Sequence, residues 1–226
     1  MTFERYAIYW APEQDSALAE FGGQWLGGDP AAGAEMAGLD EALFERATRS
    51  PARYGLHGTI KAPFRLRDGC TPESLEEELL AFCARRRRMI CGKLRLHRFA
   101  RYLALVPERP RAELDWLAAD CVTHFDRFRA PLSEADRERR AGHSLSPRDQ
   151  SLLEQFGYPQ IFENFFFHLS LAGPLDESDL SRVEQAIAPV VEPFTRDAFR
   201  FEDLCLFGDP GGGAAFKLLS RAPLMR

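Results

Sequence analysis

The hydrophobic and polar positions along the chain follow two spacings, which together predict a mixture of strands and helices. Aromatic and β-branched residues crowd into residues 5–10 before Pro12, which predicts a buried strand. Residues 15–26 have helical spacing, whereas the Gly- and Ala-rich residues 27–38 predict a loop with short helical turns. A longer scaffold helix with one buried stripe is predicted by the spacing of Leu114, Leu117, Cys121, Phe125 and Phe128.

Two stretches of the chain repeat one plan of elements. The first begins with HGTI at His57 and leads to the amphipathic segment TPESLEEELLAFCARR, which Thr71 caps. The second begins with HLSL at His168 and leads to DESDLSRVEQAIAPVV, which Asp176 caps. Strand-like sequence follows each helix, at 90–106 and 199–219. The order strand, helix and strand pair therefore occurs twice.

The repetition predicts an α+β fold in a single bilobal domain that spans residues 1–226. We expect pseudo-two-fold-related lobes around 50–107 and 162–222, each with a mainly antiparallel sheet and packed helices, and a cleft between them. A helical connection and a polar insertion are expected at about 108–161.

Each repeat begins with a histidine two residues before a hydroxyl residue. Side chains at positions i and i+2 of a strand project from one face, so His57 and Thr59 point together and Lys61 follows them. His168 and Ser170 repeat the arrangement. If an approximate two-fold relates the halves, the pairs meet in one cavity. There, two imidazoles act as general base and general acid, and the hydroxyls donate to phosphate oxygens.

HGTI and HLSL resemble the two H-h-[S/T]-h tetrapeptides, with h apolar, that define the 2H phosphoesterase superfamily. The segments YGLHGTIKAPFRL and FGYPQIFENFFFHLSLAGPL are similar to a branch of it often encoded beside phosphonate-utilisation genes. This resemblance covers most of the chain. It implies a bilobal α+β fold, no metal ion or other cofactor, and hydrolysis or transfer at phosphodiesters, often 2',3'-cyclic nucleotides or other cyclic phosphates.

By motif position, the resemblance implies that His57 and His168 are catalytic and that Thr59 and Ser170 bind the phosphate. Gly58 departs from the motif, which has an apolar residue there, and glycine weakens a strand.

Further candidates lie around the two motifs. Lys61 is expected to stabilise negative charge on the phosphoryl group, and Tyr54 to offer a hydroxyl or a stacking face. Tyr158 is a further substrate-binding candidate. The insertion is expected to form a cationic lid over an anion, through Arg137, Arg139, Arg140, His143 and Arg148. His97 and His124 lack a hydroxyl partner and are interpreted as structural.

The charge and composition of the chain limit the kinds of ligand that it is expected to bind. The formal net charge of −5 gives no positive field for long nucleic acids, so we expect a small phosphorylated substrate, a nucleotide or a sugar phosphate. The run 85–88 places its arginines at a predicted helix end, where cations suit the helix dipole. No H-E-x-x-H, H-x-H or zinc-type cysteine spacing occurs, and the 211–213 glycines lack the Lys and Ser/Thr of a phosphate-binding loop.

Five scattered cysteines and a start without a secretory pattern favour a reduced, cytoplasmic protein, and no apolar run predicts a membrane partner. The leading prediction is a metal-independent hydrolase of a small cyclic phosphate or phosphodiester, linked by resemblance to phosphonate breakdown. Two other functions stay open: an RNA-end phosphotransferase or ligase-like enzyme, and a non-catalytic module that binds a nucleotide or phosphometabolite. The structural alternative is a pair of core histidines bonded to backbone carbonyls.

Overall fold

The strands form one eight-stranded sheet in the order β6-β3-β4-β5-β2-β1-β7-β8, with antiparallel neighbours throughout. The computed structural model describes residues 3–134, 136–137 and 145–226. Its strands are β1 (Arg5–Trp10), β2 (Gly58–Phe64), β3 (Met89–Phe99), β4 (Tyr102–Pro107), β5 (Leu169–Ala172), β6 (Ala198–Phe201), β7 (Asp203–Asp209) and β8 (Lys217–Pro223). Its α-helices are α1 (Ala17–Leu26), α2 (Pro30–Ala37), α3 (Glu41–Ala52), α4 (Pro72–Cys83), α5 (Ala112–Phe125), α7 (Pro147–Phe156) and α8 (Glu177–Val191). The predicted α+β class is confirmed.

The helices begin where the sequence supplies capping side chains. Thr71 accepts from the Ser74 amide at the start of α4, and Asp176 accepts from the Asp179 amide at the start of α8, as predicted. The stretch expected to be a loop with short turns instead contains the two-turn helix α2. Asp29 caps that helix and Gly38 ends it in the left-handed region at φ 65°.

The two histidine-bearing repeats exchange their strand pairs. β2 and β5 meet at the centre of the sheet through the pair Gly58 and Leu169, with four strands on each side of this junction. α4 follows β2 and packs on β7 and β8, yet β3 and β4, which come next in the chain, join β5. Each half of the sheet is therefore built from interleaved segments, which corrects the expected contiguous lobes around 50–107 and 162–222. The spacing of apolar residues predicts single helices and strands, but it does not predict which strands pair with one another.

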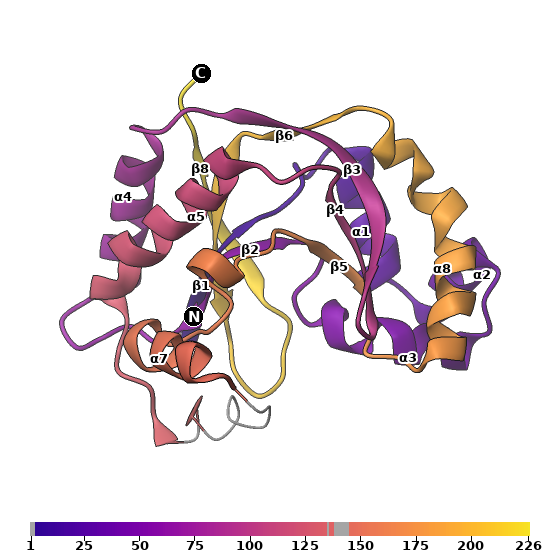
Figure 1. The fold of residues 1–226 in the computed structure, drawn as a ribbon, viewed down its shortest axis with the longest axis horizontal. Coiled ribbons are helices and arrows are strands. Elements are labelled where there is room, and N and C mark those ends of the chain that lie inside the picture. The colour runs from indigo at the N-terminus through magenta and orange to yellow at the C-terminus, as the bar shows by residue number, and fades with distance from the viewer. Residues whose placement is uncertain (1–2, 135, 138–144) are drawn as a thin grey trace.

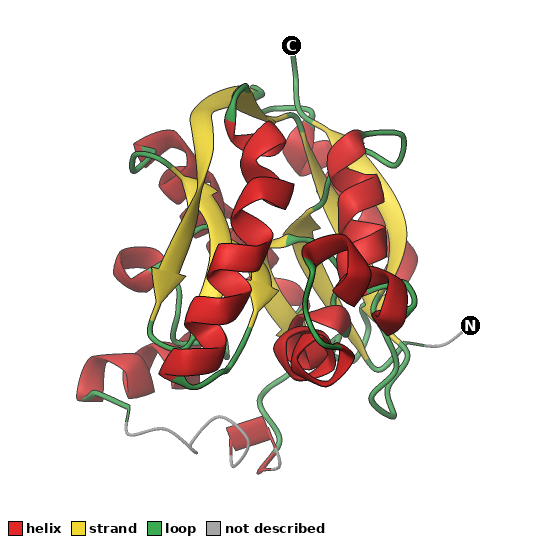
Figure 2. Ribbon diagram, turned by 90° about the vertical axis from the view of Figure 1, so that its right-hand side faces the viewer, coloured by secondary structure: helices red, strands yellow, loops and turns green. Residues whose placement is uncertain are grey.

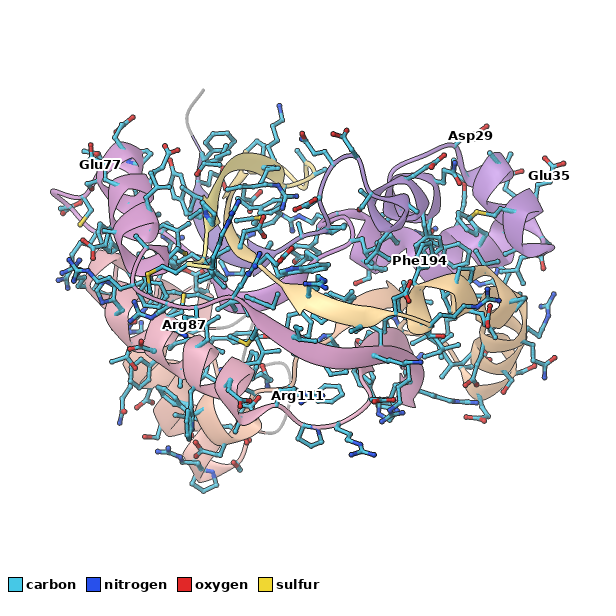
Figure 3. All side chains as sticks on the ribbon, turned by 90° about the horizontal axis from the view of Figure 1, so that it is seen from above. Asp29, Glu35, Glu77, Arg87, Arg111 and Phe194 are labelled. Carbon is cyan, nitrogen blue, oxygen red and sulfur yellow. The ribbon has the colours of Figure 1, made fainter. Side chains whose placement is uncertain are left out.

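Helices cover the two halves separately. Figure 1 shows α4 and α5 beside one half, and α1, α2, α3 and α8 beside the other. Glu77 of α4 and the residues Asp29 and Glu35 of the α2 region lie at opposite ends of the molecule (Figure 3). Seen from the side of α2, α3 and α8, the strands of the sheet are twisted and curled (Figure 2). None of the helices among the described residues has both the length and the apolar sequence needed to cross a bilayer.

The side chains on the two faces of β1 pack into two different hydrophobic clusters. Tyr6, Ile8 and Trp10 join the large core beneath the helices. The alternate residues Tyr9 and Ala7 belong to a smaller cluster with β7, on the face away from those helices. The His57 ring lies on this second face, because the Tyr9 ring is centred 4.2 Å from it, and His168 lines the same cavity as Tyr9.

Candidate active site

The candidate site lies at the central junction of the sheet. Gly58 pairs with Leu169 in antiparallel register, so the chain directions bring His57 next to Ser170 and Thr59 next to His168. All four side chains line one cavity of about 470 Å³. This volume is suited to a small metabolite. The folded chain thus brings together the two pairs that the sequence analysis singled out.

Gly58, the departure from the motif, has a steric reason. A Cβ atom added at this position would lie 2.3 Å from Cε2 and 2.4 Å from Cζ of the Phe167 ring. Phe167 is itself buried and packs against Phe199 and Phe201. Glycine is therefore required for the two histidine-bearing strands to approach this closely.

Both imidazoles are oriented in the same way. Nδ1 of His57 donates to the Gly55 carbonyl oxygen at 2.9 Å, and Nδ1 of His168 donates to the Phe166 carbonyl oxygen at 2.7 Å. A carbonyl oxygen only accepts, so each Nδ1 carries a hydrogen and each neutral ring leaves Nε2 as its free lone pair. The Thr59 hydroxyl lies 3.3 Å from Nε2 of His57. The predicted structural alternative, bonding to backbone carbonyls, therefore occupies Nδ1 only and leaves Nε2 for chemistry.

Burial keeps both histidines neutral in the free protein. It lowers the pKa of His57 to about 4, with a smaller lowering from nearby His168, against the opposing effect of the Gly55 carbonyl. Burial also lowers the pKa of His168, again opposed by its backbone acceptor. The effect of His168 on the pKa of His57 is consistent with the two rings lining one cavity.

Aromatic side chains hold each imidazole from two sides. Tyr9 and Tyr54 pack against His57, with ring centroids 4.2 and 5.5 Å away. Phe99 and Phe166 pack against His168 at 5.4 and 5.7 Å. These contacts contribute to the burial that lowers the pKa of each histidine.

Lys61 does not lie in the histidine cavity, which corrects the expectation that it follows Thr59 on the same face. Its side chain is buried, and Nζ donates to the Val122 carbonyl at 3.1 Å and lies 3.6 Å from Asp126 Oδ1. The reason is a β-bulge, since β1 pairs Tyr9 with Thr59 but Ile8 with Lys61. One extra residue turns the following side chain to the opposite face of the sheet.

The remaining predicted residues divide into two groups. Tyr54 and Tyr158 both line the cavity. Of the five lid candidates, Arg139, Arg140 and His143 lie outside the described residues, and Arg137 is exposed and does not line the cavity. Arg148 pairs with Glu163 at 2.5 Å instead of facing the cavity.

Several cavity residues were absent from the sequence prediction. Arg5 and Tyr9 come from β1, and Phe99 and Phe166 flank His168. The alternation along residues 5–10 carried a signal for the first two, because Arg5 and Tyr9 share one face of a strand. No local pattern marked Phe99, which reaches the site through the exchange of strand pairs.

The described part of the chain contains no group of three or more His, Cys, Asp and Glu side chains placed to hold a metal ion. His124 lies apart from the cavity and bonds Glu78 at 2.6 Å. Nδ1 of His97 accepts from the Arg95 guanidinium at 2.9 Å, and His97 does not line the cavity either. Of the histidines described, His57 and His168 are the two that line the cavity.

Comparison with known families matches residues 59–217 to a family described as protein of unknown function (DUF1045). The chain belongs to this family. The match covers Thr59 and the whole second motif, so both halves of the candidate site fall within or next to it.

Two longer curated proteins are similar to the chain. Ribose 1,5-bisphosphate phosphokinase PhnN of Janthinobacterium sp. (strain Marseille) is 37% identical over 180 residues, covering 77% of this chain and 40% of that protein. The protein of the same name from Laribacter hongkongensis (strain HLHK9) is 32% identical over 218 residues, covering 95% of this chain and 50% of that protein. The chain thus spans half or less of the length of these relatives.

Solved structures give weaker matches that cover all of both chains. A crystal structure of a phosphoesterase aligns with a TM-score of 0.45 and 15% identity. E. coli LigT complexed with 3'-AMP aligns with a TM-score of 0.45 and 14% identity. Likeness at this level assigns the chain neither a fold family nor a function.

Proposed function

We propose that the chain is a metal-independent phosphodiesterase of the two-histidine kind that hydrolyses a small cyclic phosphate. The observation that supports this most is the pairing of His57 with Thr59 and of His168 with Ser170 around a single cavity. Each imidazole presents an unprotonated Nε2, because its Nδ1 hydrogen is bonded to a carbonyl. Hydrolysis of a phosphodiester needs a proton acceptor where water attacks the phosphorus and a proton donor where the leaving oxygen departs. The two imidazoles match these two roles, and the two hydroxyls can donate to the remaining phosphoryl oxygens.

His57 is the general base and His168 the general acid in this proposal. The base must be neutral at working pH, and burial lowers the pKa of His57 to about 4. His57 accepts a proton from water as the water oxygen bonds to phosphorus. His168 delivers a proton to the leaving oxygen as the phosphorus–oxygen bond breaks, and the hydroxyls of Thr59 and Ser170 donate to the non-bridging oxygens. A bound anionic phosphate raises the pKa of His168, so Nε2 takes up a proton from the solvent and later passes it to the leaving oxygen.

The names of the longer relatives suggest which cyclic phosphate is the substrate. They are named for phosphorylation of ribose 1,5-bisphosphate, and this chain resembles up to half of each. We propose that the part of the relatives that this chain resembles produces the substrate of the phosphokinase, which is a sugar with a C1 phosphate. A C1 phosphate is produced when water opens a cyclic diester that bridges O1 and the neighbouring O2, with the P–O2 bond breaking. The candidate substrate is therefore ribose 1,2-cyclic phosphate 5-phosphate, and the link to phosphonate breakdown stays a prediction from resemblance.

A kinase is the second candidate, favoured only by the relatives' name. The chain contains no G-x-x-x-x-G-K-[ST] segment of the kind that cradles nucleotide phosphates. We therefore attribute the phosphokinase activity to the part of the relatives that this chain does not cover. RNA-end transfer and binding without turnover use the same pocket, and product analysis distinguishes them.

The test is a panel of 2',3'-cyclic nucleotides and ribose cyclic phosphates, incubated with the purified chain with and without chelator. We expect hydrolysis of a ribose 1,2-cyclic phosphate to a C1 monoester, undiminished by chelator. Tight binding without product would favour the binding module, and ATP-dependent phosphorylation of ribose 1,5-bisphosphate would favour the kinase. Either result would overturn the proposal.

A further inference from the structure

A second cavity of about 440 Å³ adjoins the histidine cavity and is lined by three arginines. Arg5 of β1, Arg53 after α3 and Arg65 after β2 reach it from separate segments of the chain. Arg5 lines both cavities and so marks where the second space borders the first. Arginines that converge from separate elements are a common arrangement for binding phosphate.

Two of the three arginines, Arg5 and Arg53, share one carboxylate, whereas Arg65 pairs with Asp136. Asp209 is fully buried and accepts from Arg5 Nε at 2.9 Å and from Arg53 Nη2 at 3.3 Å. Burial acts to raise the pKa of Asp209, but the Gly211 amide and the two guanidinium groups outweigh it and lower that pKa overall. One carboxylate thus serves two cations. Nε of Arg53 is buried and has no hydrogen-bond partner among the described residues, an unmet donor beside the cavity.

A glycine turn forms another wall of the same cavity. Gly211, Gly212 and Gly213 have φ values of 86°, 61° and 81°, and all three line the space. The Gly211 amide donates to Asp209 at 3.0 Å, whereas within the described residues the amides of Gly212 and Gly213 donate to no protein acceptor. An added Cβ atom at Gly212 or Gly213 would meet nothing within 4 Å, so this backbone is open. Successive unpaired amides in such a turn attract anions.

We propose that this arginine cavity is a second anion subsite, which binds a phosphate monoester of the same ligand whose cyclic phosphate lies between the histidines. The inference rests on the proposed function, and the monoester is then the 5-phosphate of the ribose. The carboxylates of Glu4 and Asp136 also line the space, so directed N–H donors rather than net charge provide the affinity. Arg53 is the residue that decides specificity, because its Nε lacks a partner in the free protein.

The competing interpretation is structural: Arg53 and Asp209 only anchor the turn after β7 to the end of α3. Arg53 also packs its guanidinium 5.8 Å from the Phe216 ring centre and 5.9 Å from that of Tyr54, which lines the histidine cavity. An anchoring role would affect every substrate alike. A subsite role affects only substrates that carry the second phosphate.

The test compares kcat/KM for ribose 1,2-cyclic phosphate with and without a 5-phosphate, in wild type, Arg53→Gln and Arg196→Gln. Arg196 pairs with Glu192 on a remote surface and is the matched control. We expect wild type to prefer the 5-phosphorylated substrate, and Arg53→Gln to reduce that preference by about tenfold to a hundredfold, as loss of charged hydrogen bonds implies. Arg196→Gln should keep the wild-type preference.

An unchanged preference in Arg53→Gln, with both substrates losing the same factor, would overturn the subsite while the proposed hydrolysis stands. If wild type hydrolyses neither substrate, calorimetric titration with ribose 1,5-bisphosphate decides. Binding that Arg53→Gln weakens and Arg196→Gln does not would support the subsite although the proposed hydrolysis fails. Absence of binding would overturn both. Melting temperature is measured for each variant, and Arg53→Lys, which retains the charge, should recover part of the preference.

Discussion

Replacement of Gly58 by alanine tests the geometry that joins the two histidines. The added Cβ atom would lie 2.3 Å from the Phe167 ring, more than 1 Å closer than an ordinary carbon contact of about 3.5 Å. The ring has little room to retreat, because Trp10, Phe199 and Phe201 surround it. The strands themselves must therefore move apart.

The expected loss of stability is about 1 to 3 kcal/mol, the usual range for overpacking a core. The expected loss of activity is larger. Gly58 pairs with Leu169, and each of these residues follows a histidine, so a shift of this pair moves His57 relative to His168. A misplacement of about 1 Å in an active site costs about a hundredfold in rate. We therefore expect kcat/KM to fall about a hundredfold while most of the protein stays folded.

The assay combines urea unfolding with hydrolysis kinetics for Gly58→Ala, Phe167→Leu and the double variant. A smaller side chain at position 167 makes room for the new methyl group, so the two changes should couple by about 0.5 to 3 kcal/mol. Gly23→Ala is the matched control, because an added Cβ there meets nothing within 4 Å and helix α1 gains about 0.5 to 1 kcal/mol from alanine. Wild-type stability and activity in Gly58→Ala, or zero coupling with Phe167→Leu, would refute this reasoning.

Further predictions concern the titrating groups. In the free enzyme, kcat/KM should rise with pH as His57 loses its proton, at a pKa of about 4. It should fall again as His168 loses its proton, at a pKa below the usual 6.5. A maximum of kcat/KM above about pH 8 would contradict the assignment. Because the folded pKa of His57 is lowered, its contribution to stability is complete above pH 6.5. Urea unfolding should show a loss of roughly 3 kcal/mol as pH falls from 6.5 to 4, and none from this source in His57→Asn. Lys61→Met should leave kcat within a few-fold of wild type and reduce stability by about 1 to 2 kcal/mol, because the Val122 carbonyl loses its donor. A loss of about a hundredfold in kcat would instead show that Lys61 acts in catalysis.

Local physics made the helices and the histidine pair predictable from the sequence. Thr71 and Asp176 cap α4 and α8 because a side-chain oxygen there meets a free amide, which depends on a few neighbouring residues. The spacing of His57 and Thr59 likewise placed both on one face of a strand, and both line the cavity.

The features that were not predicted from the sequence depend on pairing between strands that lie far apart in the chain. Lys61 was assigned to the wrong face because the bulge between β1 and β2 arises from pairing with Ile8 and Tyr9. The exchange of strand pairs between the repeats depends on which strand edges meet, and periodicity says nothing of that. The need for glycine at position 58 became visible only with the Phe167 ring beside it.

The most direct test of the central claim is a titration of the histidine-labelled chain with inorganic phosphate, followed by nitrogen NMR of the imidazoles. His57→Asn and His168→Asn variants assign the two resonances, and His124, which bonds Glu78 outside the cavity, serves as the internal reference. One bound phosphate should shift Nε2 of His57 and of His168 together, with a single Kd, and raise both pKa values while His124 stays unchanged. If only one imidazole responds, or if the two respond with different affinities, they do not share a phosphate and the account is wrong.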